Sequence, residues 1–232
     1  MSKLSDAPTM PKLRVEIWSD VICPWCYIGK RRFEAATADL DIERVWRSFE
    51  LAPGAPRHRE GDMAGHLARK YGMSLELADR SIASITEQAA AEGLTYRLDI
   101  AQPGNTFDAH RVLHLARERG VQDACKERFL AGYLTEGVAI GLPENLVTLA
   151  VDVGLDRDEV RDVLESARYA DAVREDEATA LELGISAVPT FVVGRADAAE
   201  AGDAQPRVAI PGAQHPQTIR QVIDRVIDRI MD

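Results

Sequence analysis

Apolar and polar residues alternate in two stretches near the start of the chain, which predicts β-strands over residues 13–18 and 42–51. Residues 28–35, between them, carry apolar side chains at helical spacing and predict a helix. Toward the other end, apolar runs bounded by turn residues predict two more strands, over residues 189–193 and 207–210. An apolar stripe over residues 218–231 predicts a closing amphipathic helix. Strand patterns therefore lie at both ends of the chain.

The middle of the chain shows helical patterns separated by glycine, proline and asparagine residues, which are typical helix stops and starts. A last helix is expected just before the strand at residue 189. The predicted helices cover residues 62–71, 74–92, 105–119, 121–135, 144–153, 157–168 and 171–183. An all-helical block thus separates the two groups of strands.

Two cysteines, Cys23 and Cys26, stand where the first strand pattern ends and the first helical pattern begins. Cys23 is therefore expected at a helix N-terminus, where unpaired backbone N–H groups and the positive end of the helix dipole favour a thiolate. Cys26 follows one turn later, and Pro24 is well suited to a first helical turn. This spacing predicts a pair that cycles between dithiol and disulfide.

Half of a zinc site is the competing interpretation of two cysteines at this spacing, because zinc takes four ligands. His110 and His114, four residues apart on a predicted helix, can supply a second pair, whereas Cys125 stands alone. A non-catalytic zinc or chaperone-like binding module is therefore one hypothesis. We nevertheless predict no metal, and we interpret Cys125 as a packed core thiol because it shares an apolar stripe.

The chain of 232 residues has 38 acidic and 28 basic side chains, for a formal net charge of −10. This excess of negative charge argues against nucleic acid and anionic membrane surfaces as partners. Residues 1–12 are polar, lack the apolar run of a signal peptide and are expected to be disordered. We therefore predict a cytoplasmic protein, a setting in which closely spaced cysteines are more often catalytic than structural.

The order strand, helix, strand, helical block, helix, strand, strand, helix predicts an α/β protein with a thioredoxin-like fold and an all-helical insertion domain. Residues 13–55 together with 171–232 form the predicted thioredoxin-like domain, and residues 56–170 form the insertion. Residues 195–206, rich in Ala, Asp and Gly, are expected to be a long loop between the last two strands.

Four segments, taken together, resemble the DsbA-family oxidoreductases of the FrnE-like branch. The segments are Val15 to Gly29, Asn105 to Arg111, Gly184 to Phe191 and Pro211 to Gln214. The resemblance covers nearly all of the chain after residue 12. It departs from the family pattern at residues 194–211, which are longer than the usual hairpin.

The resemblance implies a thiol-disulfide oxidoreductase that acts on protein dithiols and disulfides through its Cys-Pro-Trp-Cys pair. The same family contains 2-hydroxychromene-2-carboxylate isomerases, which are glutathione-dependent and carry serine where Cys23 stands. A glutathione-dependent isomerase or transferase is therefore the alternative, although the presence of both cysteines favours disulfide chemistry. No resident cofactor is implied, and glutathione is a candidate co-substrate. Expected partners are protein or small-molecule thiols and disulfides and a donor or acceptor of electrons, with the chain a monomer or a dimer.

The second element of the expected site is Val188-Pro189, for which the resemblance implies a cis peptide packed against the cysteines. The Val188 backbone would then pair with an extended substrate, and Pro189 would shield the sulfurs. Pro24 and Trp25, between the cysteines, are expected to contact substrate, with Trp25 forming an apolar rim.

The resemblance also implies that the helix beginning near Asn105 faces the cysteine pair, so that Asn105 and His110 contact a glutathione-like or peptide substrate. The residues themselves allow a simpler interpretation, in which Asn105 caps the helix. For Cys23, the helix N-terminus together with an uncharged Trp25 predicts a pKa nearer ~7 than ~3.5.

Overall fold

The computed structural model describes residues 12–59, 61–196 and 207–231, and its centre is a mixed four-stranded sheet. The strand order is β2-β1-β3-β4, with β1 and β2 parallel and the other neighbours antiparallel. The strands are β1 (Leu13–Ser19), β2 (Ile42–Ser48), β3 (Thr190–Arg195) and β4 (Val208–Pro211). The first two strands and the last two strands of the chain therefore meet in one sheet, as the thioredoxin-like prediction requires.

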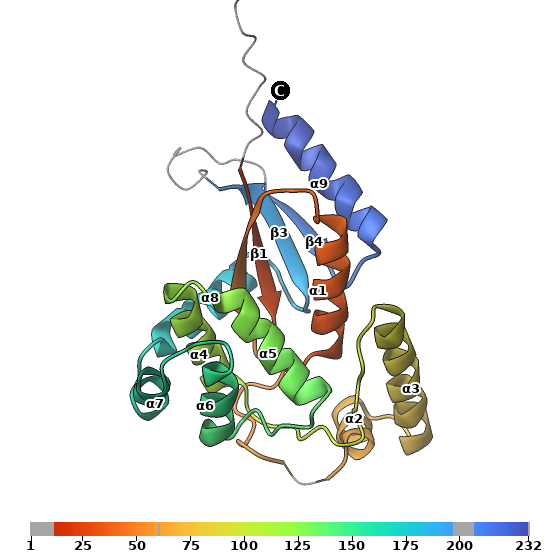
Figure 1. Ribbon diagram of the computed structural model, residues 1–232. Helices are drawn as coiled ribbons and strands as arrows, with labels where there is room; N and C mark the ends of the chain where they lie inside the picture. The colour runs from red at the N-terminus through yellow and green to blue at the C-terminus, as the bar shows by residue number, and fades with distance from the viewer. Residues whose placement is uncertain (1–11, 60, 197–206, 232) are drawn as a thin grey trace, which may run out of the picture.

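Helices α1 (Pro24–Ala36) and α9 (Pro216–Met231) cover one face of this sheet (Figure 1). Alternation along β1 directs Val15 and Ile17 toward these helices, where they are fully buried in one apolar cluster. Phe33 of α1 stacks on Phe191 of β3 in the same cluster, with 5.1 Å between ring centroids. This packing fixes the helix that follows the first cysteine against the centre of the sheet.

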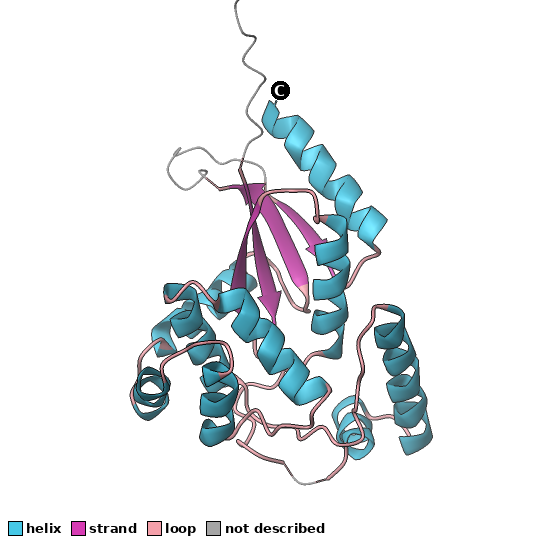
Figure 2. Ribbon diagram, in the orientation of Figure 1, coloured by secondary structure: helices cyan, strands magenta, loops and turns pink. Residues whose placement is uncertain are grey.

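Between β2 and β3, the described residues form helices and loops without a strand (Figure 2). Helix α8 packs against β2 and α4, while α2 and α3 form a pair in which α3 also contacts α1. The helices are α2 (Met63–Tyr71), α3 (Leu75–Ala91), α4 (Phe107–Glu118), α5 (Gln122–Leu134), α6 (Pro143–Val151), α7 (Arg157–Glu165) and α8 (Ala170–Glu182). Each predicted helix and strand is present, with ends that differ by up to four residues.

The helical block and the sheet share one apolar core. A single buried cluster contains Trp18 of β1, Ile28 of α1 and Val192 of β3 together with Phe129 of α5 and Leu146 of α6. The insertion is therefore packed into the fold rather than attached at its edge. Division of the chain into two domains at residues 55 and 170 stays a prediction.

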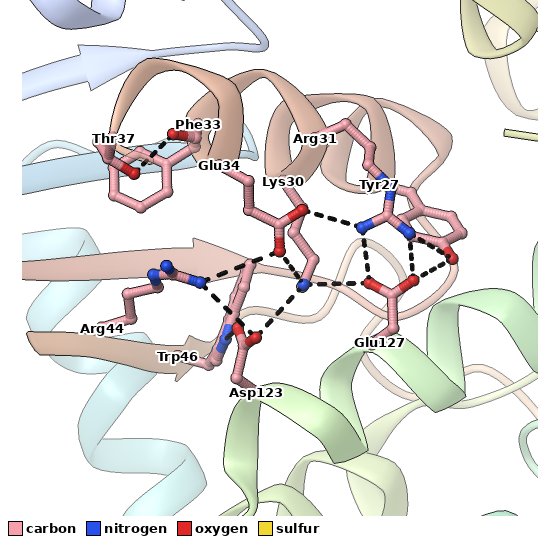
Figure 3. Close-up of polar contacts among 10 residues, drawn as sticks. All are labelled: Tyr27, Lys30, Arg31, Phe33, Glu34, Thr37, Arg44, Trp46, Asp123 and Glu127. Carbon is pink, nitrogen blue, oxygen red and sulfur yellow. Dashed lines mark hydrogen bonds and ion pairs between the residues drawn. The ribbon is translucent and has the colours of Figure 1, made fainter. Parts of the chain in front are cut away.

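An ion-pair network joins α1 to α5 on the surface of this core (Figure 3). Lys30 of α1, whose side chain is buried, lies 3.0 Å from Glu127 and 3.4 Å from Asp123 of α5, and it also pairs with Glu34. The hydroxyl of Tyr27 donates a 2.5 Å hydrogen bond to Glu127. The cysteine-bearing helix is thus held to the helical block by charge as well as by apolar contact.

The expected disorder of residues 1–12 and the expected loop at 195–206 fall almost wholly outside the described residues. In the part of the chain that the structure describes, no helix is long and apolar enough to cross a membrane.

Replacing Phe33 with Ala is expected to lower the free energy of unfolding by about 3 to 5 kcal/mol, because a fully buried ring that stacks on Phe191 is lost. Leu181→Ala is the control, since Leu181 is 81% exposed, and its effect should stay within about 0.5 kcal/mol. Urea unfolding of both variants measures the difference, and equal losses would contradict this account of the core.

Candidate active site

Cys23 is the N-cap of α1, with extended backbone angles (φ −87°, ψ 114°), and Pro24 is the first helical residue. The missing N–H of proline costs nothing at this position, because first-turn N–H groups have no partner within the helix. The Cys26 N–H donates to the Cys23 carbonyl oxygen at 3.0 Å, which places the two residues one turn apart. Both are free thiols, and only 4% of Cys23 and 1% of Cys26 is exposed. The expected cysteine pair at the helix start is confirmed.

The loop before β3 packs directly on this pair. Its Val188-Pro189 peptide is cis, as expected, and the Cys23 thiol donates to the Val188 carbonyl oxygen at 3.7 Å. Pro189 approaches α1 so closely that a Cβ on Gly29 would lie 2.7 Å from its Cγ. Gly29 therefore permits the contact that holds the loop against the cysteine-bearing helix.

A buried carboxylate lies behind the pair. Asp20, fully buried after β1, accepts a 2.7 Å hydrogen bond from the Leu51 N–H, and its other oxygen lies 3.4 Å from Nε2 of His110. Burial alone would raise the pKa of Asp20, but the imidazole and this N–H outweigh it and lower the pKa. Asp20 is therefore charged, and its charge is held within the core.

A buried amine lies behind the pair as well. Lys126 of α5 is 0% exposed, and its ammonium donates to the Ser19 carbonyl oxygen at 3.1 Å, at the end of β1. The ammonium lies 5.4 Å from the ring centroid of Trp46. Burial lowers the pKa of Lys126, whereas the neighbouring acidic groups, Cys26 first among them, oppose that change. An acidic and a basic group are thus both buried close to the cysteine pair, each with its own partners.

The two sulfurs titrate as a unit, because ionising one opposes ionising the other. Hydrogen bonding to Cys26 and burial raise the pKa of Cys23 well above its ordinary value. Burial opposes ionisation of Cys26 too, but the hydrogen bond from Cys23 and the charge of Lys126 lower its pKa. Because the two thiols share one titration, the pKa predicted for Cys23 by itself, nearer ~7 than ~3.5, stays a prediction.

A cavity of about 800 Å³ opens beside Cys23. Cys23, Pro24 and Trp25 form one part of its wall, with residues 186–188 beside them, and α2 and α3 form the opposite part. Trp25, 39% exposed, supplies an apolar surface as expected. The volume of the cavity lies in the range of pockets that enclose small ligands.

The charge of this cavity is opposite to that of the whole chain. Arg59, Lys70 and Arg80 line it, along with His66, whereas no Asp or Glu is among the described residues of its wall. The guanidinium of Arg59 lies 3.2 Å from Nδ1 of His66, so these two side chains lie together in the wall. A chain of net charge −10 therefore has three cationic side chains in the wall of the cavity at its cysteines, of which Arg80 pairs with Glu76 at 3.1 Å.

The other expected substrate contacts lie elsewhere. The N-cap of α4 is Thr106, not Asn105 as the sequence suggested; Asn105, one residue earlier, accepts a 2.9 Å hydrogen bond from the Phe107 N–H and donates to Glu50 at 3.3 Å. His110 is 1% exposed and lies against Asp20. Neither residue lines the cavity, so their contact with substrate stays a prediction, and their geometry favours structural roles.

Sequence reasoning missed Lys126, the cationic side chains of the cavity, and Tyr96, whose hydroxyl donates to the Pro24 carbonyl oxygen at 2.6 Å. The burial of Lys126 could have been predicted from the sequence, because it lies four residues from both Gln122 and Leu130 on the buried side of α5. Cys125 is fully buried, as expected of a core thiol, and burial raises its pKa. Among the described residues, no group of three His, Cys, Asp or Glu side chains is arranged to hold a metal ion.

The model of the DSBA-like thioredoxin domain matches residues 14–224, which is nearly the whole described chain. The chain belongs to this DsbA-like family. A probable DsbA oxidoreductase from Streptomyces coelicolor is 44% identical, with a TM-score of 0.83 over 92% of this chain and 89% of that one. The DsbA-like chain described here is therefore an enzyme of a thiol oxidoreductase family.

Two further similarities are more distant. YwbO, an uncharacterized protein of Bacillus subtilis (strain 168), is 29% identical over 184 residues, which are 78% of this chain and 87% of that protein. A 2-hydroxychromene-2-carboxylate isomerase is 18% identical, with a TM-score of 0.68 over 94% of this chain and 98% of that one. The isomerase shares the fold of the DsbA-like chain, which agrees with the relation inferred from sequence.

Gly29→Ala is expected to destabilise the DsbA-like chain by about 1 to 3 kcal/mol and to change the reactivity of Cys23, because the new methyl group displaces Pro189. Gly194→Ala is the control, since a Cβ there meets Arg207 at an ordinary 3.5 Å. Thermal unfolding and the rate of Cys23 alkylation report the two effects. Normal stability and alkylation in Gly29→Ala would show that the contact is not needed.

Proposed function

We propose that the protein is a thiol-disulfide oxidoreductase whose redox centre is the pair Cys23 and Cys26. One observation supports this most directly: Cys23 lies in the wall of a ligand-sized cavity while Cys26 lies behind it, away from the cavity lining. A substrate sulfur entering the cavity thus meets Cys23 first. Cys26 is then close enough to form or to break the bond to Cys23.

In the oxidising direction, a substrate thiolate attacks Cys23 of the disulfide, the bond between Cys23 and Cys26 breaks, and Cys26 departs as a thiolate. A second substrate thiolate attacks the substrate sulfur of the mixed disulfide and releases Cys23. The substrate loses two electrons and the pair gains them. In the reducing direction the same steps run backward, with Cys23 attacking a substrate disulfide and Cys26 resolving the adduct. A separate thiol or disulfide couple recycles the pair.

The size and the charged side chains of the cavity support a class of substrate. Its size suits a small ligand or an extended cysteine-bearing segment, and its cationic side chains suit carboxylates. Glutathione, a thiol with two carboxylates, is the co-substrate we assign to it. We therefore also propose a cytoplasmic setting, where glutathione sets the thiol redox poise.

The proposal predicts different outcomes for the two cysteines. Cys23→Ser should abolish reduction of glutathione disulfide and of insulin, because the attacking sulfur is gone. Cys26→Ser should lose turnover but accumulate a mixed disulfide with glutathione on Cys23, since the resolving sulfur is gone. Mass spectrometry of the intact protein and assay of turnover measure both effects.

Cys125→Ser is the matched control for this experiment, because Cys125 is buried in the core outside the cavity wall. It should retain turnover and bind no glutathione covalently. Turnover that persists in Cys23→Ser, or a mixed disulfide that forms on Cys125, would refute the proposed redox centre.

A glutathione-dependent isomerase is the second candidate, and the extent of the cavity favours it. The cavity runs from Cys23 to Arg80 and Ile85 on α3, which leaves space for an apolar substrate beside a thiol. This activity would use the Cys23 side of the cavity without a resolving cysteine. Glutathione-dependent isomerisation that survives in Cys26→Ser would therefore support it over disulfide exchange.

The cationic wall predicts discrimination between disulfides. Lys70→Met should raise KM for glutathione disulfide about two- to fivefold, the range expected for one exposed charge, and should leave KM for the neutral hydroxyethyl disulfide unchanged. Arg229→Met, on α9, makes the same change in net charge away from the cavity and serves as control. Equal effects of the two variants would show that only net charge matters.

A further inference from the structure

Arg59 places a positive charge in the cavity wall that no carboxylate of the described residues balances. Its guanidinium lies 3.2 Å from Nδ1 of His66, and none of its contacts joins it to an Asp or Glu side chain of the described chain. Arg80, which also lines the cavity, differs in that it pairs with Glu76 at 3.1 Å. A guanidinium is a preferred partner for carboxylates because its donors match the two carboxylate oxygens. The wall therefore holds a guanidinium that a carboxylate from outside can engage.

The contact between Arg59 and His66 fixes which ring nitrogen of the histidine carries a proton. A guanidinium has only donors, so the Nδ1 that it meets at 3.2 Å accepts and carries no proton. The ring is then neutral, with its proton on Nε2. Nε2 makes no hydrogen bond with the described residues and is not enclosed by them. His66 thus lines the cavity as a neutral ring with one N–H donor to offer.

The groups around His66 favour this neutral state. Burial lowers the pKa of His66, and three neighbouring cations lower it further: Arg59, Lys70 and Arg69. The other titratable or charged side chains of the described wall are Cys23 on α1, Tyr71 on α2, Arg80 on α3 and Tyr133 on α5. Tyr133 stays neutral, because burial raises its pKa. The carboxylate of Asp62 accepts from the Gly65 N–H at the start of α2 and is not part of the wall. No anion of the described wall therefore draws a proton onto His66.

A carboxylate that reaches this wall changes the balance at His66. The guanidinium of Arg59 bonds a carboxylate more strongly than a neutral ring, because both partners are then charged. Nδ1 loses its donor and becomes free to accept a proton, and the nearby negative charge favours the protonated ring. The proton comes from solvent, and the imidazolium becomes a second cation beside the carboxylate. Binding of the anion and uptake of one proton are thereby coupled.

We propose that Arg59 and His66 form a carboxylate-binding subsite that takes up a proton together with its ligand. The subsite favours thiols and disulfides that carry a carboxylate, and its preference for them strengthens as the pH falls. The inference rests on the redox function proposed above, and it adds how the same cavity distinguishes charged from neutral substrates. The backbone of Arg59 is anchored for this task, because its N–H donates at 3.0 Å to the carbonyl oxygen of Pro103, another residue of the wall.

The direction of the pH dependence follows from which state binds the proton. A ligand carboxylate raises the pKa of His66 above its value in the ligand-free protein, so the complex binds more protons at any pH between the two pKa values. Affinity is therefore highest below the ligand-free pKa and falls as the pH rises through the pKa of the complex. A difference of one pKa unit makes binding about tenfold tighter at the acidic end than at the alkaline end. A ligand without a carboxylate should show no such change.

The test measures binding of S-methylglutathione, which carries the two carboxylates of glutathione but no thiol that can exchange. Isothermal titration calorimetry of the full chain, over about one pH unit on each side of ~6.5, gives the affinity. Buffers with different heats of ionisation give the number of protons taken up. We expect the wild type to bind about tenfold more tightly at the acidic end and to take up protons on binding. His66→Gln should bind without uptake, because glutamine still accepts from Arg59 and offers a donor but cannot be protonated.

His58→Gln is the matched control, since it removes an exposed histidine that precedes Arg59 in the chain but does not line the cavity, and it should behave like the wild type. Arg59→Gln should bind more weakly and take up fewer protons, because loss of this neighbouring cation raises the pKa of His66 before the ligand binds. Circular dichroism checks that each variant folds.

The outcomes separate this subsite from the redox function. Wild-type protein that binds no S-methylglutathione, or binds it with an affinity that does not change with pH, would overturn the subsite. Proton uptake that persists in folded His66→Gln would overturn it as well. Failure of the wild type to reduce the neutral hydroxyethyl disulfide, which needs no carboxylate contact, would instead overturn the proposed redox function.

Discussion

The sulfurs of Cys23 and Cys26 lie inside the protein, and a thiolate there costs free energy that the surrounding groups must offset. The elements around the two sulfurs supply polar groups that can offset this free energy. β1 ends at Ser19 and is followed by the buried Asp20. The first turn of α1, whose N–H groups have no partner within the helix, begins next to Cys23, and the Val188 carbonyl oxygen accepts a hydrogen bond from the Cys23 thiol. The cysteine pair is thus placed where strand, helix and loop each contribute a polar group to it.

Local signals sufficed for the elements that carry this centre. The alternation along β1, Pro24 at the first turn of α1 and the short apolar run after Pro189 each depend on neighbouring residues alone, and each was predicted close to its observed bounds. The helical block followed for the same reason, because its glycine and proline stops are local. A pattern of this kind fixes which elements exist and in what order.

Residues brought together from distant elements escaped prediction. His110 and His114 are four apart on α4, which suggested one shared role, yet the fold pairs His110 with Asp20 and His114 with Asp176, 3.1 Å away. Lys126 was missed for a similar reason, since a helix start is visible in the sequence whereas the ammonium of Lys126 is brought to the Ser19 carbonyl by α5. The cationic cavity also needs α2 and α3 folded over Cys23 before its charge becomes visible.

The cavity draws its two walls from different parts of the chain. One wall belongs to α1 and the loop before β3, whose packing is tied to the sheet, while α2 and α3 supply the other and bury only Met63, Ala78 and Ala89 of their own residues. Most substitutions in α2 and α3 therefore change few contacts of the buried core. Evolution can remodel what enters the cavity through this helical pair and leave the electron-transferring sulfurs intact, so one redox centre can be inherited by enzymes with very different substrates.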